Sequence, residues 1–162
     1  MSPPTDNCGV ALDIIEIAGD FFSSANIGHH AHDVSLNGSY AYVASDSRSN
    51  GLAVVDVHDP ENPVVVDTLN IGSKGRSIIT KGNYAYMGVQ ATYNGLSIIN
   101  ISNPLAVTLL STLNIEDYGN NLALNGNNLY IAVETDEGFA SVDVTNKNSP
   151  VLLNSLDIDD KG

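Results

Sequence analysis

Three histidines gather within four residues near the start of the chain, at His29, His30 and His32. Imidazole nitrogens are common ligands of zinc and copper, so this cluster raises the question of a metal site. Neighbouring residues of an extended segment point to opposite sides, so His30 and His32 could converge on one ion while His29 could not easily join them. The sequence offers no identifiable fourth ligand. We therefore favour polar, hydrogen-bonding histidines over a metal site, and we expect no cofactor.

Two oxygen-rich segments invite the same question for calcium, at Asp46 to Gly51 and at Glu134 to Gly138. Neither has the Asp-x-Asp-x-Asp-Gly spacing of a calcium loop, and Arg48 would oppose a cation in the first segment. The chain also shows no Ser-His-Asp order, phosphate-binding loop, HExxH motif or paired catalytic carboxylates. The sequence therefore predicts a protein that is not an enzyme.

An internal repeat supplies the elements that must position these residues. The repeat is clearest in a dipeptide that ends in glycine and recurs every 44 residues, as Asn37-Gly38, Lys81-Gly82 and Asn125-Gly126. A fixed period of this length indicates one supersecondary unit that is copied along the chain. We expect three full units, at 28–71, 72–115 and 116–158. Residues 9–27 match the second half of a unit, 159–162 match the start of a further one, and 1–8 read as a disordered lead.

Each full unit contains four short runs of β-branched or aromatic residues and no window of helical periodicity. In the first unit these runs are 32–36, 40–45, 52–57 and 64–71. Asn-Gly or Lys-Gly between the first two runs suits a tight hairpin, and an Asx-Pro type turn separates the last two. The pattern predicts a four-stranded antiparallel meander in every unit.

The strands of these meanders carry apolar residues on both faces, as in Leu52-Ala53-Val54-Val55, so each sheet must be covered on both sides. Small residues such as Ala44 and Gly88 alternate with tyrosines, which lets a neighbouring sheet approach closely. Four-stranded sheets that stack radially are the blades of a β-propeller. The predicted fold is therefore all-β, with about three and a half blades. Because propellers close with about four to eight blades, we expect an open or partial propeller.

The strings GSYAYVASDSRSNGLAVVDVHDPENP and KGNYAYMGVQATYNGLSIINISNP resemble the LVIVD repeat. Units of that family read roughly as Gly-Asn-Tyr-Ala-Tyr-Val, followed by Gly-Leu-x-Ile-Ile-Asp-Val-Ser-Asp-Pro. The resemblance covers residues 9–158 and is looser in the third copy. It implies a β-propeller, usually in secreted or surface-anchored proteins, and it implies no single activity.

One polar residue recurs at the same frame position between aliphatic neighbours, as Glu16, Asp56, Asn100 and Asp143. A catalytic carboxylate is needed once, whereas this residue appears in every unit and is Asn in one of them. We expect its side chain to form a hydrogen bond with the turn that follows. The repeated tyrosines are framework residues by the same reasoning, at Tyr42, Tyr86 and Tyr130.

The propeller topology implied by the resemblance divides the connections between two faces. The turns after the first and third strands repeat from unit to unit, whereas those after the second and fourth strands diverge. Loops on a rigid scaffold commonly carry binding, so we expect the binding site on the divergent face. The candidate residues are His30, His32, Arg48, Lys74, Arg76, Tyr93, Tyr118, Asn120 and Asp136.

Composition limits the partners. Nineteen acidic residues against six Lys and Arg give a formal charge of −13, which repels nucleic acid and anionic lipid surfaces. The single Cys8 allows no internal disulfide or CxxC-type metal site. The first residues lack the features of a signal peptide, and no window approaches the length of a membrane span. We predict no nucleic acid partner and no membrane insertion.

These observations favour a non-catalytic scaffold for protein interaction or assembly, secreted or at the cell surface. Its partner would be another protein or further copies of itself, and the chain would be oligomeric or part of a larger chain. Two alternatives remain open. One is a hydrolase or metal-dependent oxidoreductase at the mouth of the central channel, built on His30 and His32 with Tyr118 or Asn120. The other is a structural subunit that self-assembles through open strand edges.

Overall fold

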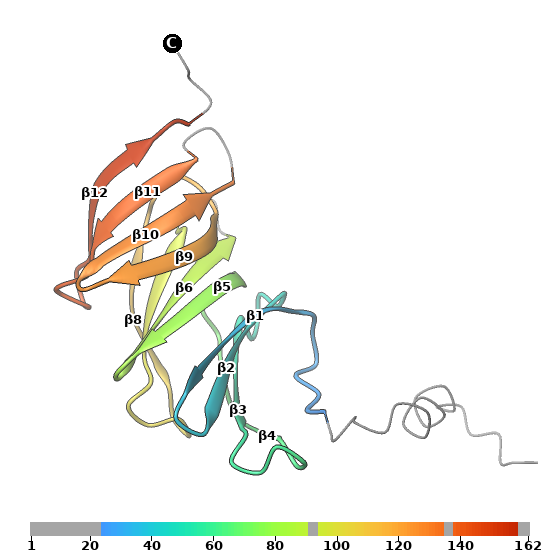
Figure 1. The fold of residues 1–162 in the computed structure, drawn as a ribbon. Coiled ribbons are helices and arrows are strands. Elements are labelled where there is room, and N and C mark those ends of the chain that lie inside the picture. Colours follow the sequence, from blue (N-terminus) through green and yellow to red (C-terminus); the bar gives the residue numbers. More distant parts are fainter. Residues whose placement is uncertain (1–23, 91–93, 135–137, 159–162) are drawn as a thin grey trace, which may run out of the picture.

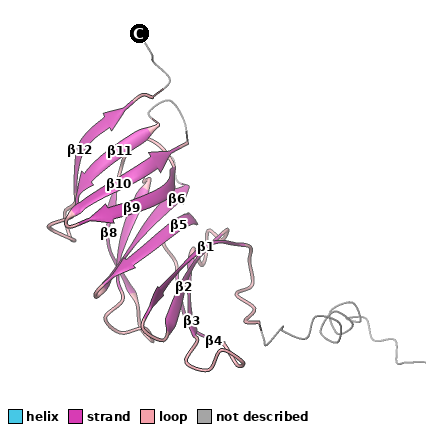
Figure 2. Ribbon diagram, in the orientation of Figure 1, coloured by secondary structure: helices cyan, strands magenta, loops and turns pink. Residues whose placement is uncertain are grey.

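A computed structural model describes residues 24–90, 94–134 and 138–158 of the chain (Figure 1). These residues form twelve strands and no helix, and therefore no helix that could cross a bilayer (Figure 2). The predicted all-β class is confirmed. Most of the predicted half unit at 9–27 lies outside the described residues, as do the lead at 1–8 and residues 159–162, and the described residues 24–30 form no strand.

The strands make three antiparallel sheets, each with its four strands in chain order, so the predicted meanders are confirmed. The first blade contains β1 (Ala31–Asn37), β2 (Tyr40–Ser45), β3 (Leu52–Asp56) and β4 (Val64–Leu69). The second contains β5 (Lys74–Lys81), β6 (Tyr84–Gln90), β7 (Leu96–Asn100) and β8 (Thr108–Leu113). The third contains β9 (Gly119–Asn125), β10 (Asn128–Val133), β11 (Phe139–Asp143) and β12 (Val151–Leu156).

Tight hairpins join the first two strands of every blade. Gly38, Gly82 and Gly126 have φ angles of 60°, 57° and 61° there. Residues with a side chain rarely adopt this conformation, which explains the glycine in the repeated Asn-Gly and Lys-Gly pairs. The repeat therefore fixes the register of each hairpin as well as its position in the chain.

The blades stack face to face around their first strands, so that β5 lies against both β1 and β9 (Figure 1). One apolar cluster, which includes Tyr42, Leu52 and Met87, fills the space between the first and second blades. A second cluster, which includes Tyr86, Leu96 and Ile131, lies between the second and third blades. Burial raises the pKa of both tyrosines, as expected for framework residues. The described chain is thus an open arc of three propeller blades.

Small residues mark the points where adjacent blades come closest. A Cβ added to Gly75 would lie 3.2 Å from the Cα of Ala44, and one added to Gly119 would lie 2.9 Å from the Cα of Gly88. The close approach predicted at Ala44 and Gly88 is confirmed. The glycines at the start of β5 and β9 supply the other half of each contact, which the sequence interpretation did not identify.

The repeated polar residue at the end of the third strand forms the predicted hydrogen bond. Asp56 Oδ1 accepts from the backbone N–H of His58 at 2.8 Å, and Asn100 Oδ1 accepts from Ser102 at 2.9 Å. Asp143 Oδ1 accepts from Thr145 at 2.7 Å, and hydrogen bonds from Thr145 lower the pKa of this carboxyl. Each side chain caps the turn two residues ahead, so the position is structural in all three described blades. Glu16 lies outside the described residues.

Asn100→Ala should therefore lower the free energy of unfolding by about 0.5 to 1.5 kcal/mol, the net contribution of one hydrogen bond. Asn100→Asp is the matched control, because it keeps the acceptor and copies the residue of the other two blades. Urea unfolding at neutral pH measures both. An Asp variant that loses as much stability as the Ala variant would contradict the capping role.

Candidate functional site

The connections after the second and fourth strands of each blade lie together at one end of the arc, which we call the divergent-loop face. Its described segments are 46–51, 70–73, 94–95, 114–118, 134, 138 and 157–158, with residues 28–30 before β1. The strand ends beside these segments belong to the same face and carry His32, Lys74, Arg76, Gln90 and Asn120. A hydrogen bond from Ser73 Oγ to the Gln90 carbonyl at 2.7 Å ties the connection before β5 to the end of β6. Sequence reasoning placed its candidate binding residues on this face.

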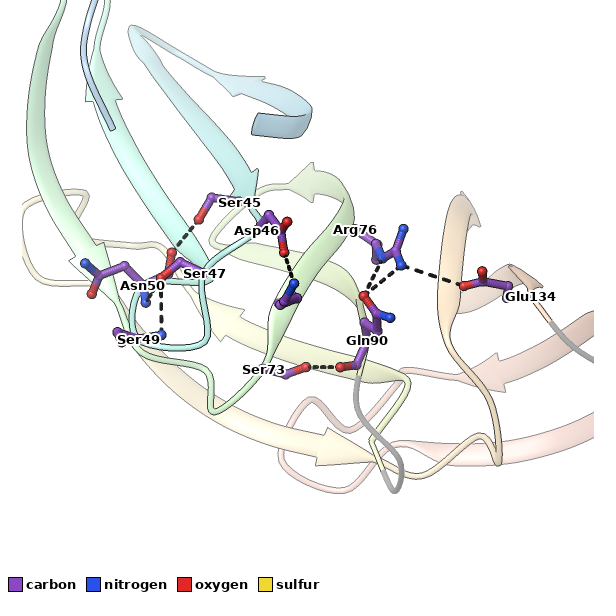
Figure 3. A network of polar contacts seen from close by, with 10 residues as sticks. Ser45, Asp46, Ser47, Ser49, Asn50, Ser73, Arg76, Gln90 and Glu134 are labelled. Atoms are coloured by element: carbon purple, nitrogen blue, oxygen red, sulfur yellow. Dashed lines mark hydrogen bonds and ion pairs between the residues drawn. The ribbon is translucent and has the colours of Figure 1, made fainter. Parts of the chain in front are cut away.

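Figure 3 shows a polar network that crosses the divergent-loop face from blade to blade. Lys74 Nζ of the second blade lies 2.5 Å from Asp46 Oδ1 of the first, and it holds the pKa of this carboxyl below its usual range. Arg76 donates from Nε and Nη2 to Gln90 Oε1 at 3.1 and 2.7 Å. Its Nη2 also lies 3.9 Å from Glu134 Oε2 of the third blade. Two predicted residues, Lys74 and Arg76, therefore link all three blades.

The acceptors of this network occupy one frame position of the repeat, as Asp46, Gln90 and Glu134. Sequence reasoning considered Asp46 and Glu134 only as calcium ligands and did not name Gln90. Aligning the divergent loops by repeat position would have revealed a column of oxygen-bearing side chains. In the structure Asp46 already has a cationic neighbour in Lys74, and Ser47 Oγ accepts from the backbone of Ser49 and Asn50. In the first oxygen-rich loop, the Asp46 carboxylate is thus paired with Lys74 and the Ser47 hydroxyl is bound to the backbone of the loop itself.

The histidines lie on the same face as exposed side chains. The His30 carbonyl accepts from the Asp46 backbone N–H at 2.8 Å, and both His30 and His32 add to the lowering of the Asp46 pKa. Within 24–90, 94–134 and 138–158, no three His, Cys, Asp or Glu side chains lie close enough together to hold a metal ion. In the described part of the chain, the histidines are exposed polar side chains beside Asp46.

The other predicted residues are more scattered. Arg48 is exposed at the tip of its loop, Asn120 is exposed on β9, and Tyr118 is half-buried. Tyr93 and Asp136 lie outside the described residues. The structure thus joins Lys74 and Arg76 in one network and leaves Arg48 at its margin.

The opposite end of the arc carries the repeated turns and a hollow of about 250 Å³ beside Tyr84, Gly126 and Lys147. Lys147 Nζ lies 5.6 Å from the centre of the Tyr84 ring. Asn37 Nδ2 donates to the Gly82 carbonyl at 2.6 Å, and Lys81 Nζ donates to the Gly126 carbonyl at 3.3 Å. These contacts recur from blade to blade, so this end of the arc holds neighbouring blades together.

Comparison with known families gives a clear match. The family model of the LVIVD repeat matches residues 28–70, 72–114 and 118–158. No curated protein matches the sequence.

Solved structures share the fold at low sequence identity. The computationally designed Ika8 protein is 12% identical, with a TM-score of 0.60, over 81% of this chain and 38% of its own. The designed Ika4 protein is also 12% identical, with a TM-score of 0.60, over 82% of this chain and 78% of its own. A protein from Bacteroides uniformis, provisionally named a 6-phosphogluconolactonase, is 16% identical, with a TM-score of 0.67, over 80% of this chain and 41% of its own. This chain thus spans about four tenths of the Ika8 and Bacteroides proteins.

Proposed function

The chain belongs to the LVIVD repeat family, and from this premise we propose that it is a non-catalytic propeller scaffold whose divergent-loop face binds a protein partner. One observation carries the proposal. The polar residues that recur in every blade are engaged in the fold, as the hydrogen bonds of Asp56 and Asn100 illustrate. The side chains that differ from blade to blade gather on the divergent-loop face, where His32 and Arg48 are exposed.

The electrostatics of that face also support the proposal. The whole chain carries only six Lys and Arg, and three of them, Arg48, Lys74 and Arg76, lie there beside the exposed histidines. The network of Lys74 and Arg76 fixes the rims of neighbouring blades relative to each other. A rigid face with exposed polar groups loses little conformational freedom on binding, which favours recognition of a folded partner. An extracellular or surface location belongs to the same proposal and follows from what is usual in the family.

The test compares two triple alanine variants of the full chain. The loop-face variant changes His32, Arg48 and Asn120, and the control changes the chemically matched His58, Lys81 and Asn127 at the repeated turns. All six residues are exposed, and Lys81 gives up only one exposed hydrogen bond of 3.3 Å to the Gly126 carbonyl, so each substitution should alter the free energy of unfolding by no more than about 0.5 kcal/mol. The immobilised chain and both variants are compared for the proteins they retain from an extract of the source cells.

A partner of the divergent-loop face should be retained by the unmodified chain and by the control, and lost by the loop-face variant. The purified partner should then bind the loop-face variant at least about tenfold more weakly, which corresponds to about 1.4 kcal/mol. Equal loss from both variants, or a partner that binds both as well as the unmodified chain, would contradict the proposal.

A further inference from the structure

Both ends of the arc expose residues whose counterparts elsewhere in the repeat are buried. The isoleucine after the fourth strand shows this directly, because Ile71 is 6% exposed and Ile115 is 0% exposed, whereas Ile158 is 57% exposed. The first two are covered at the junction with the following blade. Ile158 ends the third blade, which no described blade follows. The repeat therefore shows what a complete junction looks like, and each uncovered residue can be compared with it.

The outward side of the third blade, which we call the C-face, consists of Tyr130, Ala132, Phe139, Leu153 and Leu156. At the corresponding positions of the first blade, Tyr42 is 2% exposed and Leu52 is 0% exposed, because the second blade covers them. The C-face instead has a hollow of about 230 Å³ beside Tyr130, Ala132 and Phe139. Its two aromatic rings stack with their centres 6.0 Å apart.

The outward side of the first blade, which we call the N-face, consists of Ala31, Val34, Leu36, Ala41 and Val43. Val34 is 57% exposed and Leu36 is 66% exposed. Their counterparts in the third blade, Leu122 and Leu124, pack against the cluster that joins the second and third blades. The N-face therefore has the composition of the side that a propeller blade presents to the blade before it.

We propose that the N-face of a second copy of this chain packs on the C-face and repeats the junction found between blades inside the chain. This interface lies on the blade faces and meets the divergent-loop face only at its edge, where His30 and Glu134 lie. The contact is heterologous, because it joins different surfaces of the two copies. The second copy is the occupant that both faces fit, because each face carries one half of the internal junction.

The apolar residues of the two faces are complementary in size. The junction between the first two blades sets Leu52 against a cluster that contains Met87. At the same positions of the proposed junction, Phe139 replaces the leucine and Val43 of the second copy replaces the methionine. A larger residue is thus paired with a smaller one, which keeps the volume of the core close to that of the internal junction.

The point of closest approach in the proposed junction can be compared with the same point inside the chain. Inside the chain this point requires small residues, at Ala44 with Gly75 and at Gly88 with Gly119. The corresponding residues of the proposed junction are Ala132 and Ala31 of the second copy, both small and both exposed in one copy. Both internal junctions have glycine at the position of Ala31, where a Cβ would lie 2.6 Å from the Gly51 carbonyl oxygen in one junction and 2.5 Å from the Gly95 carbonyl oxygen in the other. The methyl group of Ala31 therefore requires the two copies to pack slightly further apart than adjacent blades do inside the chain.

Two polar contacts extend across the proposed junction by the same correspondence. Asn37 donates to the carbonyl of Gly82 inside the chain, so Asn125 is placed to donate to the carbonyl of Gly38 in the second copy. Lys74 pairs with Asp46 inside the chain, so His30 of the second copy would face Glu134. In both pairs the acceptor is a carboxylate, Asp46 or Glu134, and the residue that faces it, Lys74 or His30, has a nitrogen that can donate. The polar network of the divergent-loop face would then continue from one copy to the next.

The number of copies follows from the number of blades. Each copy contributes three described blades, and propellers close with about four to eight. Two copies make six blades, whereas one copy or three copies fall outside this range. The expected assembly is therefore a closed dimer with two identical junctions.

The experiment uses three variants of the full chain that each add one charge at an exposed site. Ala132→Glu blocks the C-face and Leu36→Glu blocks the N-face. Leu105→Glu is the control, because Leu105 is equally exposed in a turn of the second blade that belongs to neither face. Sedimentation equilibrium should show a dimer for the unmodified chain and for the control. Each face variant should raise the dimer dissociation constant about a hundredfold or more, because an unpaired charge would be buried.

Mixing the two face variants identifies the pairing of the surfaces. The Leu36→Glu copy keeps an intact C-face and the Ala132→Glu copy keeps an intact N-face, so the mixture should form a one-to-one dimer with a single junction. Energy transfer between separately labelled variants detects it. The proposal is overturned if the unmodified chain is a monomer, if it grows into filaments, or if one face variant dimerises by itself. The proposal is also overturned if the chain forms a dimer only after residues 1–23 have been removed, because those residues would then be the occupant of one of the two faces.

Discussion

Gly88→Val should prevent the second and third blades from packing and should be among the most destabilising single changes in the chain. A Cβ at this position would lie 2.3 Å from the carbonyl oxygen of Gly119 and 2.4 Å from Ser77 Oγ. The first of these atoms belongs to the backbone of β9, so the clash is relieved only if the blades separate. We expect a loss of about 3 kcal/mol or more, at the upper end of what overpacking costs in protein cores.

The matched control for this prediction is Ala132→Val, which changes the equivalent position on the exposed C-face. Both changes are made in the Leu36→Glu background, so that association between copies does not contribute to the measurement. The control should unfold in urea within about 0.5 kcal/mol of its parent, as is usual for exposed sites. Similar losses in both variants would show that valine harms the strand itself rather than the approach of the blades.

The fold was predictable because the repeat presents the same local signals three times. The apolar run from Leu52 to Val55 does not by itself show whether it forms a strand or a helix. Because similar runs recur between the same turns in every unit, it can be predicted to be a strand, and the observed β3 covers Leu52–Asp56. The hairpin glycines were predictable for a local reason, since a tight turn demands a positive φ. Gly75 and Gly119 were not identified, because their role depends on a neighbouring blade and no pattern within one strand reveals it.

The candidate site was predictable as a face and not as a set of contacts. Divergence among the loops located Lys74 and Arg76, but the partners of these residues come from other blades. Asp46 lies 28 positions before Lys74, and Glu134 lies 58 positions after Arg76. Sequence reasoning treated each loop as an independent set of ligands and therefore considered calcium at Asp46. In the structure the cation beside Asp46 is the side chain of Lys74. Contacts between repeats require the repeats to be aligned in space as well as in sequence.

A second prediction, for Leu96→Ala, tests how much the blade interfaces contribute to stability. Leu96 is fully buried in the cluster between the second and third blades, together with residues such as Ile115 and Ile131. Truncating it removes apolar contacts and leaves a cavity, which costs about 2 to 5 kcal/mol in protein cores. In repeat proteins, stability is approximately the sum of the units and of the interfaces between neighbouring units. The loss should therefore weaken the coupling of the third blade to the rest of the chain.

Phe139→Ala is the natural comparison, because Phe139 occupies the same repeat position on the C-face and is half-buried there. With association between copies again removed by Leu36→Glu, Phe139→Ala should lower the free energy of unfolding clearly less than Leu96→Ala does, although phenylalanine is the larger residue.

Urea unfolding measures the loss of stability in both variants, and hydrogen exchange shows in which blade it occurs. The Leu96 variant should exchange fastest in β9 to β12, because those strands lose their contact with the second blade. Uniform exchange in all three blades, or a greater loss from Phe139→Ala, would mean that the internal junction is not what stabilises the arc. The C-face could then not serve as a copy of that junction.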